Sequence, residues 1–222
     1  MPYQIAIDGP AGAGKSTIAK AVAKSLGYYY VDTGALYRGL AFGLMQKGVP
    51  FADEKAVENE IKNIDVELLY ENGVQKVFCN GTDCSTLIRT SEIGEGASVI
   101  SQYASVREKL LDLQRNVARR HSCVMDGRDI GSVVLPHANK KFFLTASPEV
   151  RARRRTLEFR EKGEPANYES ILEEVKKRDE RDMNRAVAPL KQVEDAIFID
   201  SSDLNIEEVV DRILAYCIGS ED

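Results

Sequence analysis

Residues 9–16 form a glycine-rich segment, Gly-Pro-Ala-Gly-Ala-Gly-Lys-Ser, that restricts the possible folds more than any other feature. The segment fits G-x-x-x-x-G-K-[ST] at every fixed position. An apolar run at 4–8 precedes it, and apolar residues at helical spacing follow it to position 26. This strand–loop–helix order is the context that a phosphate-binding loop needs, and a chance glycine-rich turn would not require it.

The residue types in this loop predict separate roles toward a nucleoside triphosphate. Glycines let backbone amides approach phosphate oxygens, and the helix N-terminus adds partial positive charge. Lys15 can reach the β- and γ-phosphates, and the Ser16 hydroxyl can ligate Mg²⁺. The residues expected to bind ATP are Gly9, Pro10, Ala11, Gly12, Ala13, Gly14, Lys15, Ser16 and Thr17.

Short apolar segments alternate with helical patterns along most of the chain. The predicted strands are 4–8, 28–31, 123–126, 141–144 and 196–200. The predicted helices are 15–26, 35–47, 53–63, 91–119 with a break, 148–162, 168–183 and 205–217. Ser147 and Pro148 predict the start of the helix at 148, as a capping serine followed by a proline at the first helical position. The alternation predicts an α/β fold of the P-loop NTPase type, with a parallel five-stranded sheet covered by helices on both faces.

Residues 65–84 interrupt this alternation. They contain two Asn-Gly pairs, each flanked by β-prone residues, which predicts two successive hairpins. We therefore expect a small antiparallel β subdomain inserted into the α/β fold.

The composition limits the class of ligand. The net charge of −5 disfavours nucleic acid and anionic lipid as partners, whereas the arginines at 151–155 and 178–185 form locally basic segments suited to a small anion. The four cysteines match no zinc pattern and are expected to be reduced thiols. No signal peptide or apolar membrane span is visible, so we expect a cytoplasmic protein.

Charged residues follow two of the predicted strands. Asp126 ends an apolar strand, where a carboxylate can hold Mg²⁺ through water, and Arg128 comes just after it. Asp32 and Arg38 flank the start of the helix after the second strand. Loops at the carboxyl ends of parallel strands share one edge of the sheet, so we expect these groups to face the phosphate loop. The alternatives are a turn-forming role for Asp126 and surface ion pairs for the arginines.

Two classes of phosphate-loop protein lack support. A GTPase would carry an Asn-Lys-x-Asp element, which is absent. A motor ATPase usually places a second carboxylate after the strand aspartate, but Gly127 follows Asp126 here.

Four motifs together resemble those of bacterial cytidylate kinases, a branch of the nucleoside monophosphate kinases. They are residues 8–16 (DGPAGAGKS), 32–38 (DTGALYR), 126–131 (DGRDIG) and 178–190 (RDERDMNRAVAPL). The resemblance covers nearly the whole chain, including the hairpin insertion. Thr33 stands where many members carry serine, and Ser16 where some carry glycine, and neither change removes a needed function.

The resemblance implies transfer of the γ-phosphate of ATP to CMP or dCMP, with Mg²⁺ as cofactor. The acceptor phosphate has a second pKa of about 6, so it is largely a dianion at neutral pH and needs positioning rather than a general base. The two histidines are accordingly treated as structural or surface residues. The catalytic residues expected are Lys15, Asp126, Arg128, Arg154, Arg155 and Arg185, and Ser16 and Asp126 are the expected metal ligands.

The same resemblance assigns the acceptor site. Thr33, Arg38, Arg128 and Arg185 are expected at the CMP phosphate. Ser98, Arg107 and Asp129 are expected at the cytosine, because a carboxylate accepts a hydrogen bond from the cytosine amine but repels the uracil O4 oxygen. Arg178 and Asp182 are expected at the ribose, although their four-residue spacing would equally suit a helix salt bridge.

The resemblance also divides the chain. We expect a single domain with its core at 1–63, 101–150 and 185–222, a monophosphate-binding insertion at about 64–100 and a helical lid at about 151–167. In this lid, one or two of Arg151, Arg154 and Arg155 could neutralise charge on the transferred phosphoryl group, and the spacing does not say which. Nothing in this chemistry needs a second chain, so a monomer is expected.

Three other assignments remain at this stage. The first is another small-molecule kinase, such as an adenylate kinase or a shikimate kinase. An adenylate kinase would be expected to carry Gly-Phe-Pro-Arg where this chain has Gly127-Arg128-Asp129. A nucleotide-dependent switch would not need three arginines for a second phosphate. A nucleic-acid-binding ATPase is disfavoured by the acidic charge and the lack of an aromatic-basic stripe.

Overall fold

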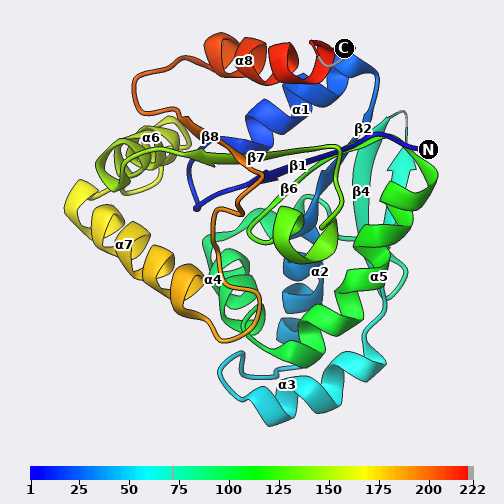
Figure 1. Cartoon of the computed structure of the whole chain (residues 1–222). Helices are drawn as coiled ribbons and strands as arrows, with labels where there is room; N and C mark the ends of the chain where they lie inside the picture. The colour runs from blue at the N-terminus through cyan, green and yellow to red at the C-terminus, as the bar shows by residue number, and fades with distance from the viewer. Residues whose placement is uncertain (72, 220–222) are drawn as a thin grey trace. The chain divides into compact units, whose positions relative to one another are not determined.

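The computed structural model describes residues 1–71 and 73–219 (Figure 1). The strands are β1 (Gln4–Asp8), β2 (Tyr29–Asp32), β3 (Val66–Glu71), β4 (Val74–Cys79), β5 (Thr82–Asp83), β6 (Cys123–Gly127), β7 (Lys140–Thr145) and β8 (Ile197–Asp200). The α-helices are α1 (Lys15–Leu26), α2 (Thr33–Gln46), α3 (Glu54–Glu60), α4 (Ser91–Ile100), α5 (Ala104–Arg120), α6 (Pro148–Glu161), α7 (Tyr168–Asn184) and α8 (Ile206–Ile218). Short 3-10 turns lie at Ile61–Asn63 and Leu87–Arg89, and a π-helical turn lies at Ile130–Val134.

The strands form two sheets. Five of them make one parallel sheet in the order β2-β6-β1-β7-β8, with Ile7 of β1 opposite Phe142 of β7 and Phe142 opposite Ile197 of β8. The other three make an antiparallel sheet in the order β3-β4-β5. The predicted five-stranded parallel sheet and the small antiparallel sheet are both confirmed.

The packing of the chain divides it into two compact units. The hairpin unit consists of residues 1–2 and 29–123, and the P-loop unit of residues 3–28 and 124–222. The insertion predicted at 64–100 lies within the hairpin unit, and the lid predicted at 151–167 lies within the P-loop unit. Those two boundaries, and the assignment of a single domain, stay predictions.

In the P-loop unit, α1 and α8 pack together beside β1 and β7 (Figure 1). Helices α6 and α7 form a second pair with a small core of their own, made by Ala152, Ile171 and Val175. Helix α6 begins with the expected cap, because the Ser147 hydroxyl accepts a hydrogen bond from the Val150 amide.

In the hairpin unit, α2 packs closely on the antiparallel sheet. Gly39 and Gly43 lie about one turn apart on α2. A β-carbon would lie 2.8 Å from a Val77 methyl at Gly39 and 2.7 Å from an Ile64 methyl at Gly43. Larger residues would force helix and sheet apart, so these glycines set the spacing of a core that also includes Leu36.

Several boundaries differ from the sequence prediction for local reasons. Helix α2 starts at Thr33 rather than 35, because the Asp32 carboxylate caps it by accepting from the Ala35 amide at 2.9 Å. The Asn80-Gly81 turn has positive φ at both residues, 49° and 78°, as a two-residue hairpin turn of this kind requires. In the other pair, Asn72 lies outside the described residues. The π-helical turn after β6 was not predicted.

Within residues 1–71 and 73–219, no helix combines the length and apolar character needed to cross a membrane.

Candidate functional site

The phosphate-binding loop connects β1 to α1 in the P-loop unit. Gly9 has φ 152°, and a β-carbon there would lie 1.9 Å from the Leu144 carbonyl oxygen of β7, so no other residue fits. Gly14 adopts the left-handed conformation with φ 86° at the N-cap of α1. The loop therefore places the first residues of α1, with the backbone amides of its first turn, next to the carboxyl end of β1.

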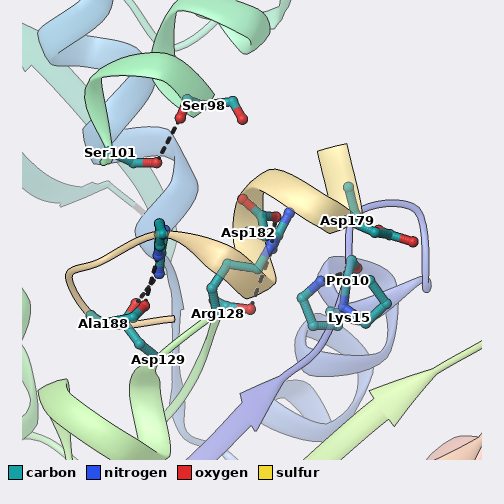
Figure 2. A network of polar contacts seen from close by, with 12 residues as sticks. Pro10, Lys15, Ser98, Ser101, Arg128, Asp129, Asp179, Asp182 and Ala188 are labelled. Atoms are coloured by element: carbon teal, nitrogen blue, oxygen red, sulfur yellow. Dashed lines mark hydrogen bonds and ion pairs between the residues drawn. The ribbon is translucent and has the colours of Figure 1, made fainter. Parts of the chain in front are cut away.

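Lys15 is buried at the first position of α1. Its Nζ donates a hydrogen bond to the Pro10 carbonyl oxygen at 2.7 Å, so the side chain folds back over the loop (Figure 2). Burial, followed by the positive charge of Arg128, lowers the pKa of Lys15 well below 10.5, and the carboxylates of Asp126 and Asp182 partly oppose this. A phosphate anion at this loop would add negative charge beside the ammonium and favour its ionised form.

Ser16 and Asp126 meet across the P-loop unit. The Ser16 hydroxyl donates to Asp126 Oδ2 at 3.0 Å, which brings an alcohol oxygen and a buried carboxylate to one point. These are the hard oxygen ligands that Mg²⁺ prefers, so the two residues fit the predicted cation. Within residues 1–71 and 73–219, no cluster of three or more His, Cys, Asp or Glu side chains could hold a metal.

Arg128 follows β6 and is held by a carboxylate of α7. Its Nε donates to Asp182 Oδ2 at 2.7 Å, as Figure 2 shows. Burial lowers the pKa of Arg128, but the carboxylates of Asp182, Asp126 and Asp8 outweigh that effect and raise it. Burial raises the pKa of Asp182, because it disfavours the charged carboxylate. The positive charges of Arg128, Arg178 and Arg185 outweigh this effect, so the pKa of Asp182 lies below its usual value.

Arg185 lies just past the C-terminus of α7. Its Nε donates to the Ala188 carbonyl oxygen at 2.7 Å, and its guanidinium lies 3.4 Å from Asp129 Oδ1. Ala188 has φ 49°, a conformation that residues with a side chain rarely adopt, and this turn brings its carbonyl back to Arg185. The predicted acceptor residues Arg128, Asp129, Asp182 and Arg185 thus form one buried or half-buried network in this unit.

The three arginines of α6 considered for the lid have different surroundings. Arg151 is buried and donates to the Ala146 and Ala11 carbonyl oxygens and to both oxygens of Asp179. Arg154 donates to the Ser201 carbonyl oxygen at 2.6 Å. Arg155 is held more weakly, with its guanidinium 3.8 Å from Glu174. The catalytic roles of Arg154 and Arg155 stay predictions.

In the hairpin unit, Asp32 organises the start of α2. Its Oδ2 accepts from Arg89 at 3.1 Å and lies 3.8 Å from Arg38 NH1. The Asp32 backbone also exchanges two hydrogen bonds with the Gln75 side chain, at 2.7 and 3.0 Å. Thr33 is buried at the first position of α2. The predicted phosphate ligand Arg38 therefore lies beside a carboxylate shared with a second arginine.

Ser98 and Arg107 are brought together around Ser101. The Ser101 hydroxyl donates to the Ser98 carbonyl oxygen at 2.9 Å, as drawn in Figure 2, and Arg107 donates to the Ser101 carbonyl oxygen at 3.1 Å. The guanidinium of Arg107 lies 5.5 Å from the centre of the Tyr37 ring. Ser98 and Arg107 are both buried, and their roles at the cytosine stay predictions.

Comparison with known proteins adds independent findings. The family model described as "Cytidylate kinase" matches residues 5–218. Curated cytidylate kinases from Geobacillus sp. and Bacillus subtilis are 49% and 48% identical to this chain over 211 and 210 residues. Each match covers 95% of this chain and 94% of the relative. The chain belongs to the cytidylate kinase family.

Among solved structures, an uncharacterized protein from Eubacterium ventriosum aligns with a TM-score of 0.52 at 15% identity, covering 99% of each chain. That likeness supports the fold alone. Membership of the cytidylate kinase family confirms the resemblance inferred from the four motifs, and the roles of individual residues stay predictions.

Sequence reasoning missed several residues that contact the candidate site residues. Asp8 accepts backbone hydrogen bonds from Ile130 and Gly131, and Arg89 shares the Asp32 carboxylate. Asp179 holds Arg151. For Asp8 the sequence did contain an indication, because it is a charged residue that ends an otherwise apolar strand. Arg89 and Asp179 could not be identified, because their roles depend on contacts between segments far apart in sequence.

The burial of Asp8 predicts a pH dependence of folding. Burial raises the pKa of Asp8 from 3.8 to about 6, against the hydrogen bonds from Gly131 and Ile130. Between about pH 4 and 6 the folded protein then binds more protons than the unfolded chain, so this residue makes stability fall as pH rises through that window. Denaturant titrations should show a wild-type pH dependence that differs from that of Asp8→Asn by about 3 kcal/mol between pH 4 and 7. Parallel curves would contradict the raised pKa.

Proposed function

We propose that the chain transfers the γ-phosphate of ATP to CMP or dCMP, forming ADP and CDP or dCDP. The match to the cytidylate kinase family over residues 5–218 carries this proposal. The structure supports it with a phosphate loop, a buried Lys15, and an Arg128 held by a carboxylate in the same unit. An ATP-hydrolysing protein would have no need of the arginines that the acceptor requires.

The P-loop would bind ATP, the phosphate donor of the reaction. Backbone amides of residues 12–17 and the Lys15 ammonium would hold the phosphates of ATP. Mg²⁺, when bound, would be held by Ser16 and Asp126, partly through water, and would neutralise charge on the β- and γ-phosphates. Lys15 would then exchange its hydrogen bond to Pro10 for a phosphate oxygen.

The acceptor phosphate would be held by Thr33, Arg38, Arg128 and Arg185. Guanidinium groups pair with phosphate through two parallel hydrogen bonds, which fixes the orientation of the attacking oxygen. Arg128 is already oriented by Asp182 and Arg185 by the Ala188 carbonyl oxygen, so little side-chain freedom is lost on binding. The acceptor is an anionic nucleophile, so no general base is needed.

The nucleoside would be recognised by polar side chains. Asp129 would accept a hydrogen bond from the cytosine amine, and Arg107 would donate to the ring acceptors, with Ser98 beside it. Asp182 uses Oδ2 for Arg128, and its Oδ1 would accept from a ribose hydroxyl, with Arg178 nearby. Arg154 and Arg155 of the proposed lid would neutralise charge on the transferred phosphoryl group.

The remaining expectations belong to the same proposal. A cytoplasmic location and a monomeric state agree with the nucleotide substrates and with the net charge of −5. ATP and CMP or dCMP would be the ligands, without nucleic acid or membrane partners.

An ADP-release assay with a panel of acceptors tests this function. CMP and dCMP should be phosphorylated far faster than UMP, AMP or GMP. In Asp129→Ala the ratio of kcat/KM for CMP over UMP should fall about tenfold or more, because the carboxylate that distinguishes the cytosine amine from the uracil oxygen is gone. A strong preference for AMP, or an unchanged ratio in the variant, would contradict the assignment.

A further inference from the structure

The turn that carries the proposed cytosine-binding residue is capped in an unusual way. Asp129 occupies the N-cap position of the π-helical turn Ile130–Val134, but its side chain accepts no hydrogen bond from the amides of that turn. An aspartate at this position ordinarily uses its own carboxylate to satisfy one of the first amides. Here that demand is met by another residue.

Asp8, at the end of β1, provides the missing cap. Its Oδ1 accepts from the Ile130 amide at 2.8 Å and its Oδ2 from the Gly131 amide at 2.7 Å. The contact joins residues more than a hundred positions apart and is buried. Both carboxylate oxygens are therefore used on two consecutive amides of one turn.

The surroundings of this contact leave it little freedom. Gly9, the next residue after Asp8, lies so close to the Leu144 carbonyl that it must be glycine, which fixes the backbone at the end of β1. At Gly131 a β-carbon would lie 3.4 Å from Asp8 Oδ2 and 3.1 Å from Cδ of Lys141. The close approach at Gly131 is therefore to the Lys141 side chain, and the distance to Asp8 is an ordinary van der Waals contact.

This arrangement leaves Asp129 with a different use for its carboxylate. Instead of capping its own turn, its Oδ1 lies 3.4 Å from the Arg185 guanidinium, within the network assigned to the acceptor. We propose that Asp8 is a positioning residue for base recognition, which caps the Ile130 turn in place of Asp129 and so holds the Asp129 carboxylate toward the acceptor nucleotide. This inference rests on the proposed function.

The experiment must distinguish this positioning role from an electrostatic effect of the Asp8 charge on Lys15 and Arg128. Asp8 is among the carboxylates whose charge favours the ionised forms of Lys15 and Arg128. If that were its role, removing the charge would disturb ATP binding at Lys15 rather than the choice of base. The two roles predict changes in different kinetic constants.

The experiment compares wild type with Asp8→Asn. An asparagine keeps the shape but can accept only one of the two amide hydrogen bonds, and its own NH₂ faces the other amide. The kcat/KM ratio for CMP over UMP should fall roughly tenfold, with the KM for ATP changing less than about twofold. Asp53→Asn is the matched control, because Asp53 also caps a helix by accepting a backbone amide, at the start of α3; its ratio should equal that of the wild type.

A double-mutant cycle distinguishes positioning of Asp129 by Asp8 from a general effect of Asp8 on the fold. In the Asp129→Ala background, Asp8→Asn should leave the CMP-over-UMP ratio unchanged, because the group that Asp8 positions is absent. An equal fall in both backgrounds, an unchanged ratio in Asp8→Asn alone, or a rise only in the KM for ATP would each overturn the inference.

The experiment also has to allow for an unfolded variant and for a wild type that does not prefer CMP. If Asp8→Asn is unfolded at the assay temperature, Asp8→Glu takes its place, because the longer side chain keeps the charge but moves the two carboxylate oxygens away from the Ile130 and Gly131 amides; an unchanged ratio there would overturn the inference. If the wild type shows no preference for CMP, the proposed function fails and this inference fails with it. A selective wild type with an unaffected Asp8→Asn rejects this inference alone.

Discussion

Arg128→Ala is expected to lower kcat/KM for CMP by about a thousandfold, because it removes a preoriented guanidinium from the acceptor phosphate. It should also lower the free energy of unfolding by about 3 kcal/mol, since the Asp182 carboxylate is left buried without the partner that now lies 2.7 Å away. Steady-state kinetics and denaturant unfolding measure the two effects separately.

The double variant Arg128→Ala/Asp182→Asn separates chemistry from folding. Replacing the orphaned carboxylate with a neutral amide should restore most of the lost stability, whereas the activity should stay low. Arg119→Ala is the matched control, because Arg119 forms an exposed ion pair with Asp112 at 3.6 Å and should change stability by less than about 1 kcal/mol. Recovery of activity in the double variant would show that Arg128 acts only through Asp182.

Lys15→Met is expected to reduce kcat by at least about a thousandfold while the protein stays folded. The ammonium is buried, its pKa is well below 10.5, and its present hydrogen-bond acceptor is the Pro10 carbonyl, so its removal costs the fold little. The thermal unfolding temperature should therefore be equal to or above that of the wild type. ADP release and a thermal melt on the same sample give both values.

Lys141 offers a closely matched control for this variant. Its Nζ also donates to the carbonyl of a proline five residues earlier, Pro136, at 2.7 Å, and it contacts Asp195 at the same distance. Lys141→Met should lower stability but change kcat by less than about fivefold. A comparable loss of kcat in both variants would mean that Lys15 is needed for folding rather than for phosphate binding.

Patterns local in sequence predicted most of the fold. The strand–loop–helix context around residues 9–16 identified β1 and α1, and the Ser147-Pro148 pair located the start of α6 because capping depends on neighbouring residues. The Asn80-Gly81 turn was predictable for the same reason, since its positive φ values depend on the residue types themselves.

The contacts that orient the candidate site could not be predicted this way. The spacing of Arg178 and Asp182 suggested a pair along one helix, but Asp182 binds Arg128, which is 54 positions away. The spacing did not distinguish Arg151 from Arg154 and Arg155, and the contacts of its guanidinium with Asp179 and two backbone carbonyls could not be predicted from it. Such pairings depend on how helices and strands pack together, and local sequence patterns do not predict them.

The most direct test of the central claim follows the γ-phosphate itself. ATP labelled at the γ-phosphate is incubated with the protein, Mg²⁺ and CMP, and the products are separated. If the chain phosphorylates CMP, the label should appear in the β-phosphate of CDP in equal amount to the ADP formed, with little inorganic phosphate. Label released as inorganic phosphate, or no turnover with CMP while another monophosphate is phosphorylated, would contradict it.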